Sequence, residues 1–461
     1  MEESKKGNYL VPLATLTTLF FMWGFITCMN DILIPYLKGV FQLTHFQSNL
    51  VQFAFFAAYF IISLIYFCIS ATIGDPIRKI GHKNMIGSGL LISATACFLF
   101  FVEAKSEEPT FIVFLFALFL LGTGFTFLQI AANPLVAQLG TAETSSSRLN
   151  LSQAFNSLGT TLAPVIGGYF VFKYFDDGSQ SASAVQIPYL LLASLLFILA
   201  GIIFFAEIPN IETDEEEKEN DPIGALKHPN LVFGMIGIFC YVGGEVTIGS
   251  NLVSLMKEVH GIAELQASKL LSFYWGGAMI GRFMGSISMS KLDNNLKYLL
   301  MFLAGIGAYG LIYFITGIKY EETLYFLLFL GLNFLVFIFA KSAPSRTLGL
   351  FAIVNMALIL IMLNTQGMAS LWTILSVGLF NSIMFSNVFT LGIRNLGKYT
   401  SQGSSLLVMM ILGGAVVPPL QGLLADIFNP QLAFAVPLAC YAYLAWYGFV
   451  GCKPKKTVEN Q

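Results

Sequence analysis

The chain has 461 residues, of which 56% are hydrophobic and only 11% are charged, and its formal net charge is −2. Soluble domains carry roughly 25% charged residues, so this composition excludes an ordinary water-soluble fold. The absence of a basic surplus argues against nucleic acid as a partner. Long apolar segments recur along the chain without the two-residue alternation of a membrane barrel, which indicates membrane-spanning helices.

The first apolar segments form a group of six. They cover residues 9–37, 47–73, 84–103, 110–140, 148–173 and 187–206. Each is long enough to cross ~30 Å of hydrocarbon as a helix. An acidic run at residues 214–217 follows, in a segment too polar to enter the membrane. We therefore expect a six-helix bundle over residues 1–206 and an acidic cytoplasmic linker over residues 207–229.

The remainder of the chain contains eight further apolar segments. They cover residues 230–257, 267–289, 297–316, 323–340, 347–363, 370–393, 402–424 and 432–450. The sequence thus predicts a C-terminal bundle over residues 230–461 and fourteen transmembrane helices in all. Short connections rich in Lys and Arg stay in the cytoplasm. Such connections follow the second, tenth and twelfth segments and the last one, so we expect both termini to be cytoplasmic.

Two short motifs occupy corresponding places in the two halves. Residues 74–83 follow the second segment and contain Asp75 and Arg78, and a related run begins at Arg282 in the eighth. A carboxylate and a guanidinium can bridge neighbouring helix ends in one access state and release them in the other. We expect Asp75, Arg78 and Arg282 to belong to such gating loops. The alternative is that these cations only obey the positive-inside rule.

Two carboxylates lie inside apolar segments, where an ionisable group is costly and indicates function. Asp31 comes shortly before Pro35, which frees a backbone carbonyl by breaking the helical hydrogen-bond ladder. Glu245 is accompanied by Gly243, Gly244 and Gly249, which permit close backbone approach. The alternative for Asp31 is an interfacial carboxylate at a helix end.

Carboxamides gather at helical spacing in the fourth and fifth segments. Gln129 and Asn133 are four residues apart, and Gln153 and Asn156 are three apart. Amides donate and accept hydrogen bonds, as recognition of a polyhydroxylated ring requires. In the second half, Trp275 and Asn381 supply an aromatic face and a further amide. The alternative is hydrogen bonding between packed helices.

An enzyme finds little support in the sequence. It contains no zinc-protease HExxH motif, no Gly-rich phosphate loop ending in Lys-Ser/Thr and no GxSxG motif. We expect neither catalysis nor a cofactor.

Several stretches together resemble one family. FFMWGFITCMNDILIP, LQIAANPLVAQLG, RLNLSQAFNSLGTTLAP, YVGGEVTIGSNLV and FYWGGAMIGRFMGS are similar to the fucose–galactose–glucose–proton symporters of the major facilitator superfamily, especially to bacterial glucose/galactose transporters. The resemblance implies two pseudo-symmetric six-helix bundles in a bacterial inner membrane. It also implies a monomer that moves a hexose by alternating access, with H+ or Na+ as coupling ion.

The resemblance also identifies residues and departures. Asp31 matches a key carboxylate of the fucose permeases, whereas Gln129 replaces their second key carboxylate and cannot titrate. Glu245 stands where those permeases carry a glutamine. Residues 348–395 resemble family helices 9 and 10, so the segments within residues 297–340 form an inserted pair. We expect this pair at the periphery.

These observations define one hypothesis. Six residues hold a hexose near the middle of the membrane: Gln129, Asn133, Gln153, Asn156, Trp275 and Asn381. Asp31 and Glu245 couple the sugar to the cation, and both would ligate it if the ion is Na+. The alternatives are a facilitator of the same fold for another neutral solute, fucose in place of glucose or galactose, and a membrane receptor without transport.

Overall fold

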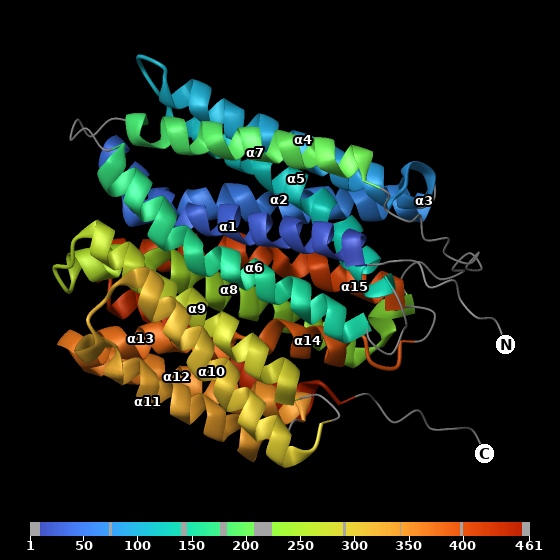
Figure 1. Cartoon of the computed structure of the whole chain (residues 1–461), viewed down its shortest axis with the longest axis vertical. Coiled ribbons are helices and arrows are strands. Elements are labelled where there is room, and N and C mark those ends of the chain that lie inside the picture. The colour runs from blue at the N-terminus through green and yellow to red at the C-terminus, as the bar shows by residue number, and fades with distance from the viewer. Residues whose placement is uncertain are drawn as a thin grey trace.

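The computed structural model describes residues 10–72, 76–139, 145–175, 182–206, 224–288, 292–341, 343–396 and 400–453. These residues are nearly all helical, and the long helices run side by side between two ends of the molecule (Figure 1). We call the end at which α1 begins the terminal end, and the end at which α1 stops and α2 starts the distal end.

The first group of helices lies within residues 10–206. It contains α1 (Leu10–Phe41), α2 (His45–Thr72), the short α3 (Pro76–Ile80), α4 (His82–Ala104), α5 (Phe111–Gln138), α6 (Ser145–Tyr169) with its π-helical extension η2 (Phe170–Tyr174), η3 (Ala182–Val185) and α7 (Gln186–Phe205). Of the expected acidic linker, residues 207–223 lie outside the described part of the chain.

The second group follows the 3₁₀ turn η4 (Gly224–Lys227). It contains α8 (Pro229–Glu258), α9 (Glu264–Ser288), α10 (Asn294–Thr316), α11 (Tyr320–Phe339), α12 (Pro344–Asn364), α13 (Gly367–Asn381), α14 (Met384–Gly392), α15 (Thr400–Met409), η6 (Met410–Leu412), α16 (Gly413–Ile427), η7 (Leu432–Ala435), α17 (Val436–Trp446) and η8 (Tyr447–Gly451). The pair α13–α14 forms one interrupted span, as do α15–α16 and α17–η8.

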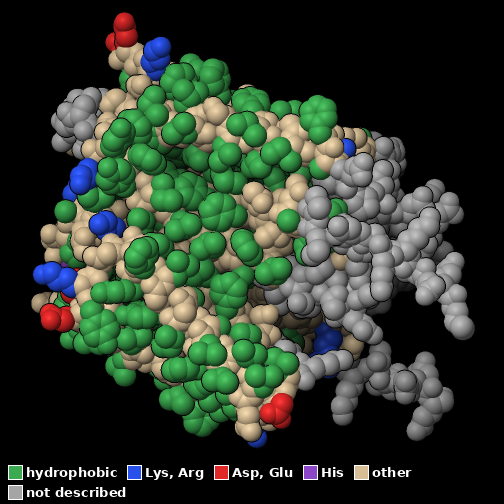
Figure 2. Space-filling view, viewed as in Figure 1, with side chains coloured by type: hydrophobic (Ala, Val, Ile, Leu, Met, Phe, Trp, Pro, Cys, Tyr) green, Lys and Arg blue, Asp and Glu red, His purple; other side chains and the backbone are tan. Residues whose placement is uncertain are grey.

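Within the described residues, 12 helices are long and apolar enough to cross a membrane. The 25-residue helices α6 and α9 are less apolar, because they carry the serines, threonines and amides of the molecular interior. Together they make 12 + 2 = 14 spans and confirm the predicted helix count. Figure 2 shows a mostly hydrophobic side surface, with charged side chains toward the two ends.

The two groups repeat one packing pattern. In the first group α1 packs on α6, α2 on α5, and α4 on both α5 and α7. In the second group α8 packs on α16, α9 on α13, and α12 on both α13 and α17. The groups meet where α2 packs on α16, α6 on α9 and α1 on α8. This repeat is the pseudo-symmetry expected of the fold.

The helices α10 and α11 have no counterpart in the first group. They pack mainly on α9 and α13 and form one edge of the molecule (Figure 1). Their buried shares, 28% and 33%, are the smallest among the twelve spans. The inserted pair is therefore peripheral, as predicted.

Glycines bring equivalent helix pairs into close contact. A Cβ atom on Gly24 of α1 would lie 2.1 Å from the carbonyl oxygen of Asn156 on α6. In the second group, a Cβ on Gly413 would lie 1.9 Å from the carbonyl oxygen of Phe239 on α8. A larger residue at either position would force the backbones apart.

Candidate binding and coupling site

Asp31 lies on α1 at the junction of the two groups and is 2% exposed. Its Oδ1 accepts hydrogen bonds from Gln52 Nε2 of α2 and from Ser250 Oγ of α8, both at 3.1 Å. Its Oδ2 accepts one from Trp275 Nε1 of α9 at 2.9 Å and a longer one from Cys28 Sγ at 3.5 Å. One buried carboxylate thus ties helices of both groups together.

Every hydrogen bond recorded for the Asp31 carboxylate comes from a neutral donor. The ion pairs among the described residues do not include Asp31. A carboxylate removed from water without a cationic partner is costly in its charged form. A proton or a small cation can neutralise such a group, as ion coupling requires.

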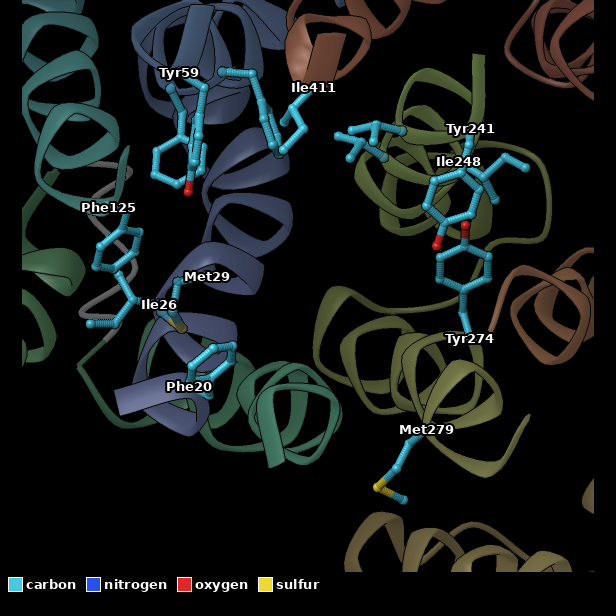
Figure 3. Close-up of a cluster of buried hydrophobic side chains, with 14 of the residues drawn as sticks. Phe20, Ile26, Met29, Tyr59, Phe125, Tyr241, Ile248, Tyr274, Met279 and Ile411 are labelled. Carbon is cyan, nitrogen blue, oxygen red and sulfur yellow. The ribbon is translucent and has the colours of Figure 1, made fainter. Parts of the chain in front are cut away.

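A glycine makes room for the indole that reaches Asp31. A Cβ atom on Gly249 of α8 would lie 2.7 Å from Cζ2 of Trp275. The neighbouring Tyr274 packs edge-on against Trp275, with 5.1 Å between ring centroids. Figure 3 shows Tyr274 pointing from α9 toward α8, where Tyr241 lies. The small residue on α8 thus fixes the position of the donor.

The first group contributes several buried polar atoms without a hydrogen-bond partner among the described residues. They include Thr27 Oγ1, both amide atoms of Asn30, and the amide oxygens of Gln52 and Gln129. Gln129 lies on α5 and is 7% exposed. Buried polar groups normally find a partner in protein, water or ligand. The first group therefore offers free donors and acceptors on α1, α2 and α5.

Glu245 lies on α8 and is 8% exposed. Its Oε1 is 3.8 Å from Nη2 of Arg282 on α9. Arg282 also donates from Nε to the carbonyl oxygen of Ser382 at 3.1 Å, and from Nη1 to Ser157 Oγ of α6. Glu245 thus has a cationic partner, which Asp31 lacks among the described residues.

Arg282 lies inside α9, six residues before its last residue, Ser288. The expectation that Arg282 lies in a loop is therefore wrong, because the residue is part of a helix. Its contacts with α6, α8 and the junction of α13 and α14 place it in the interior, and its gating role stays a prediction. Asp75 lies outside the described part of the chain, and Arg78 lies in α3 with its side chain outside it.

Gln153 and Arg282 line one small pocket between the groups. The other lining residues are Gly285, Ser286, Ile383, Ser386 and Asn387, around a cavity of about 40 Å³ that is partly open to solvent. The pocket lies toward the terminal end, because Gln153 comes early in α6 and Ser286 late in α9. Gln153, Arg282 and Asn387 bring polar side chains to its wall, and Ile383 adds an apolar one.

Asn156 and Asn381 hold helices together. Asn156 Nδ2 donates to the carbonyl oxygen of Phe20 on α1 at 2.9 Å. Asn381 is 0% exposed. Its Nδ2 donates to Tyr274 Oη at 2.9 Å, and its Oδ1 accepts from Tyr441 Oη at 2.7 Å and from Asn355 Nδ2 at 2.9 Å.

Of the predicted site residues, the structure brings together two sets. Asp31 and Trp275 are in direct contact, and Glu245, Arg282 and Gln153 lie around the pocket or beside it. Asn133 lies on α5 with its side chain outside the described part of the chain. A direct sugar contact by Asn156 or Asn381 stays a prediction.

Sequence reasoning missed Gln52 and Ser250, two of the partners of Asp31. It also missed Asn49 and Asn251, whose amides pair across the two groups at 3.0 Å. The signal was available for α2, because Asn49 and Gln52 are amides at helical spacing inside an apolar segment. The partners of Ser250 and Asn251 on α8 could not be predicted in this way, because they depend on which helix faces α8.

Further contacts join the groups at the distal end. Lys38 Nζ of α1 lies 2.8 Å from Glu258 Oε1 of α8, and His45 Nε2 lies 3.2 Å from Glu258 Oε2. The carboxylate of Asp426 on α16 accepts hydrogen bonds from the first two backbone N–H groups of α2, His45 at 2.8 Å and Phe46 at 2.9 Å. A carboxylate at a helix N-terminus accepts hydrogen bonds from backbone N–H groups that have no partner within the helix. Its negative charge also interacts favourably with the helix dipole.

Two helix groups with a repeated packing pattern, a mostly apolar outer surface and charged and amide side chains between the groups define a membrane transporter. The sequence matches the model of the Major Facilitator Superfamily over residues 14–345. The chain belongs to this superfamily.

Three comparisons extend this assignment. The chain is 42% identical over 457 residues to the glucose/galactose transporter of Brucella abortus, covering 98% of this chain and 97% of the relative. It is 28% identical to the L-fucose-proton symporter of Escherichia coli over 468 residues, covering 96% and 93%. The crystal structure of the transporter FucP in the outward conformation matches with a TM-score of 0.65 and 27% identity, covering 96% of this chain and 99% of that one.

Proposed function

We propose that the chain takes up a hexose, glucose or galactose, in symport with a cation, either H+ or Na+. The observation that carries this proposal is the buried Asp31 carboxylate, which neutral donors from both helix groups surround. The similarity to a glucose/galactose transporter supports the sugar, and the similarity to an L-fucose-proton symporter supports cation coupling.

The geometry supports a coupling mechanism in which Asp31 senses the cation. Binding of H+ or Na+ neutralises the carboxylate and weakens its hydrogen bonds with Ser250 and Trp275 of the second group. A ligand can shift a conformational equilibrium only through its different affinity for the two states. Asp31 satisfies this condition, because its partners come from both groups and must separate when the groups rock apart.

The sugar site in this proposal lies between the groups. From the first group, Gln129 supplies a free amide oxygen and Gln153 lines the pocket, and Trp275 supplies an aromatic face from the second. Asn133 would join them on α5, four residues after Gln129. Asn156 and Asn381 would contribute once the contacts that occupy them rearrange. Glu245 and its partner Arg282 then form the second charged element of the pathway.

The test of Asp31 is gradient-driven accumulation of labelled sugar in proteoliposomes. Asp31→Asn keeps the size of the side chain but cannot be neutralised by a cation, so accumulation should fall at least ~10-fold, corresponding to ~1.4 kcal/mol. Asp293→Asn is the matched control, because Asp293 caps the peripheral α10 at 3.1 Å from Asn295 N. Full accumulation by Asp31→Asn would remove Asp31 from coupling.

The sugar site is tested separately with Gln153→Ala. Loss of one amide that bonds the substrate should weaken sugar affinity ~5-fold, as for ~1 kcal/mol of hydrogen-bond energy. Gln186→Ala is the control, since Gln186 donates to the carbonyl oxygen of Ala104 inside the first group. Unchanged affinity in Gln153→Ala would exclude that residue from the pocket.

One set of uptake assays identifies both the substrate and the coupling ion. Uptake of labelled glucose, galactose and fucose is measured with an imposed Na+ gradient or an imposed pH gradient. We expect glucose or galactose to accumulate with one of the two gradients. Preferential accumulation of fucose, or of another neutral solute, would support the alternative substrates, and sugar binding without uptake would support a receptor.

We place the protein in the bacterial inner membrane as a monomer, with both termini in the cytoplasm. The terminal end then faces the cytoplasm, because the connections rich in Lys and Arg lie there. The proposed domains are residues 1–206, an acidic linker at 207–229 and residues 230–461. Labelling of a cysteine introduced at Ala263, at the distal end, by an impermeant reagent in intact cells tests this orientation. Protection from the reagent in intact cells, with labelling after lysis, would reverse it.

A further inference from the structure

The second helix group contains a basic pocket at the terminal end, separate from the transport site. Its polar lining comprises Ser345, Arg346, Arg394 and Lys453, and its apolar lining includes Leu391 and Phe449. The cavity has a volume of about 310 Å³ and is partly open to solvent. Three cations from three different elements thus border one hollow.

The three backbone segments that carry these cations are held in place. The carbonyl oxygen of Arg394 accepts a hydrogen bond from Asn230 Nδ2 at 3.0 Å, and that of Pro344, at the start of α12, accepts one from Asn387 Nδ2 at 3.1 Å. A Cβ on Gly448 of η8 would lie 2.9 Å from the carbonyl oxygen of Ser345. In a preformed pocket, little free energy is lost in ordering backbone and side chains when a ligand binds.

The charges in this basic pocket are not compensated by the elements that form it. α12, α14 and η8 contain no Asp or Glu. The ion pairs among the described residues include none of Arg346, Arg394 and Lys453. Three cations without an acidic partner among the described residues favour an anionic ligand, and the planar guanidinium groups suit a phosphate in particular.

The position of the basic pocket at the ends of the spans indicates that a membrane lipid supplies the phosphate. Arg346 is the third residue of α12, Arg394 follows α14 by two residues and Lys453 follows η8 by two. All three therefore lie at span ends, where lipid headgroups lie. Phe449, 38% exposed, and Val450, 54% exposed, continue from the pocket onto the apolar side surface. Acyl chains can lie along that surface while the headgroup enters the pocket.

We propose that the basic pocket binds the phosphate headgroup of an anionic phospholipid, with Arg346, Arg394 and Lys453 as its ligands. Basic pockets between spans recognise anionic headgroups in this way. The site is distinct from the sugar pathway, because none of its lining residues lines the pocket of Gln153 and Arg282.

The test is lipid retention by the full-length protein released from nanodiscs containing equal amounts of phosphatidylglycerol and phosphatidylcholine, read by native mass spectrometry. Wild type should retain phosphatidylglycerol selectively. Loss of one cation should weaken that selectivity ~5-fold, corresponding to ~1 kcal/mol per charge near the membrane surface. The triple variant Arg346→Gln/Arg394→Gln/Lys453→Gln should lose at least ~20-fold.

The matched control is Lys297→Gln/Lys319→Gln/Lys341→Gln, which removes the same charge from residues outside the basic pocket. It should keep the selectivity of wild type. The single variant Arg394→Gln gives the answer if the triple variant does not fold. Unchanged selectivity in Arg394→Gln and in any folded triple variant would overturn the proposal, as would equal loss in the control.

A second arm distinguishes a lipid from a soluble anion. Inorganic phosphate is titrated onto the protein in pure phosphatidylcholine discs, and its thermal stability is measured. Stabilisation by inorganic phosphate without selective retention of phosphatidylglycerol would overturn the lipid as ligand. Selective lipid retention that depends on the three cations supports it.

Discussion

The two ends of the interface between the helix groups differ in kind. At the distal end, α1 and α2 are tied to α8 and α16 by an ion pair, a carboxylate cap and an amide pair. Toward the terminal end, Gln153 and Arg282 border a pocket. The groups are thus joined by polar contacts at the distal end and leave a small pocket nearer the terminal end.

This difference shows that discrete polar bonds between the groups add to the apolar packing at the distal end. Each of these bonds can break singly. Weakening any one of them should shift the equilibrium toward a distal-open conformer. The readout is the distance between spin labels placed at Gln42 and Ala263, on a Cys68→Ser background because Cys68 is exposed.

The largest expected effect comes from the buried amide pair. Asn49→Ala removes the donor to Asn251 Oδ1, which is 3.0 Å away, and leaves that oxygen buried without this partner. An unsatisfied buried group costs ~1–3 kcal/mol, so the distal-open population should rise at least ~5-fold. Asn364→Ala is the control, since Asn364 bonds only within α12. This prediction would be contradicted if the Asn49→Ala variant gave the same distribution of distances between the spin labels as wild type.

The cap of α2 should have an intermediate effect. Asp426→Asn removes the charge and one of the two acceptors for His45 N and Phe46 N. Caps are typically worth ~1 kcal/mol, so we expect a rise of up to ~5-fold in the distal-open population. Asp293→Asn makes the same change in a cap inside the second group only and should leave the distances unchanged. Equal shifts in the two variants would mean that the cap does not act between the groups.

The smallest effect should come from the ion pair. Lys38→Gln breaks the 2.8 Å contact with Glu258. Such partly exposed pairs contribute ~0.2–1 kcal/mol, so we expect about a 2-fold shift that shrinks further at high salt. Lys257→Gln is matched to it, because Lys257 and Glu264 form a 2.6 Å pair inside the second group. A shift in Lys257→Gln as large as in Lys38→Gln would show that this contact does not distinguish the states.

The fold followed from the sequence because a membrane span is a local property of about 20 residues. The inserted pair was also predictable, since it interrupts a recognisable order of segments. The partners of Asp31 were harder to predict. Ser250 and Trp275 are separated from Asp31 by 219 and 244 positions, and only the packing of α1 against α8 and of α6 against α9 brings them together.

Local spacing also could not distinguish an amide that lines a pocket from one that joins helices. Gln153 and Asn156 lie three residues apart on α6, yet Gln153 borders the pocket and Asn156 bonds the backbone of α1. Asn381 stands on an apolar span like a pathway residue, but two tyrosines and an asparagine occupy its amide group. The difference is set by the facing helix, which sequence spacing does not reveal.

The peripheral pair α10–α11 makes the two halves of the transporter unequal in their contact with the bilayer. Because the pair rests mainly on α9 and α13, it moves with the second group and adds lipid-facing perimeter to that group alone. Rocking must therefore displace more lipid on one side of the molecule than on the other. Changes in bilayer thickness or lateral pressure should therefore act unequally on the two groups. They can bias the rocking motion in a way that a symmetric twelve-helix protein would not experience.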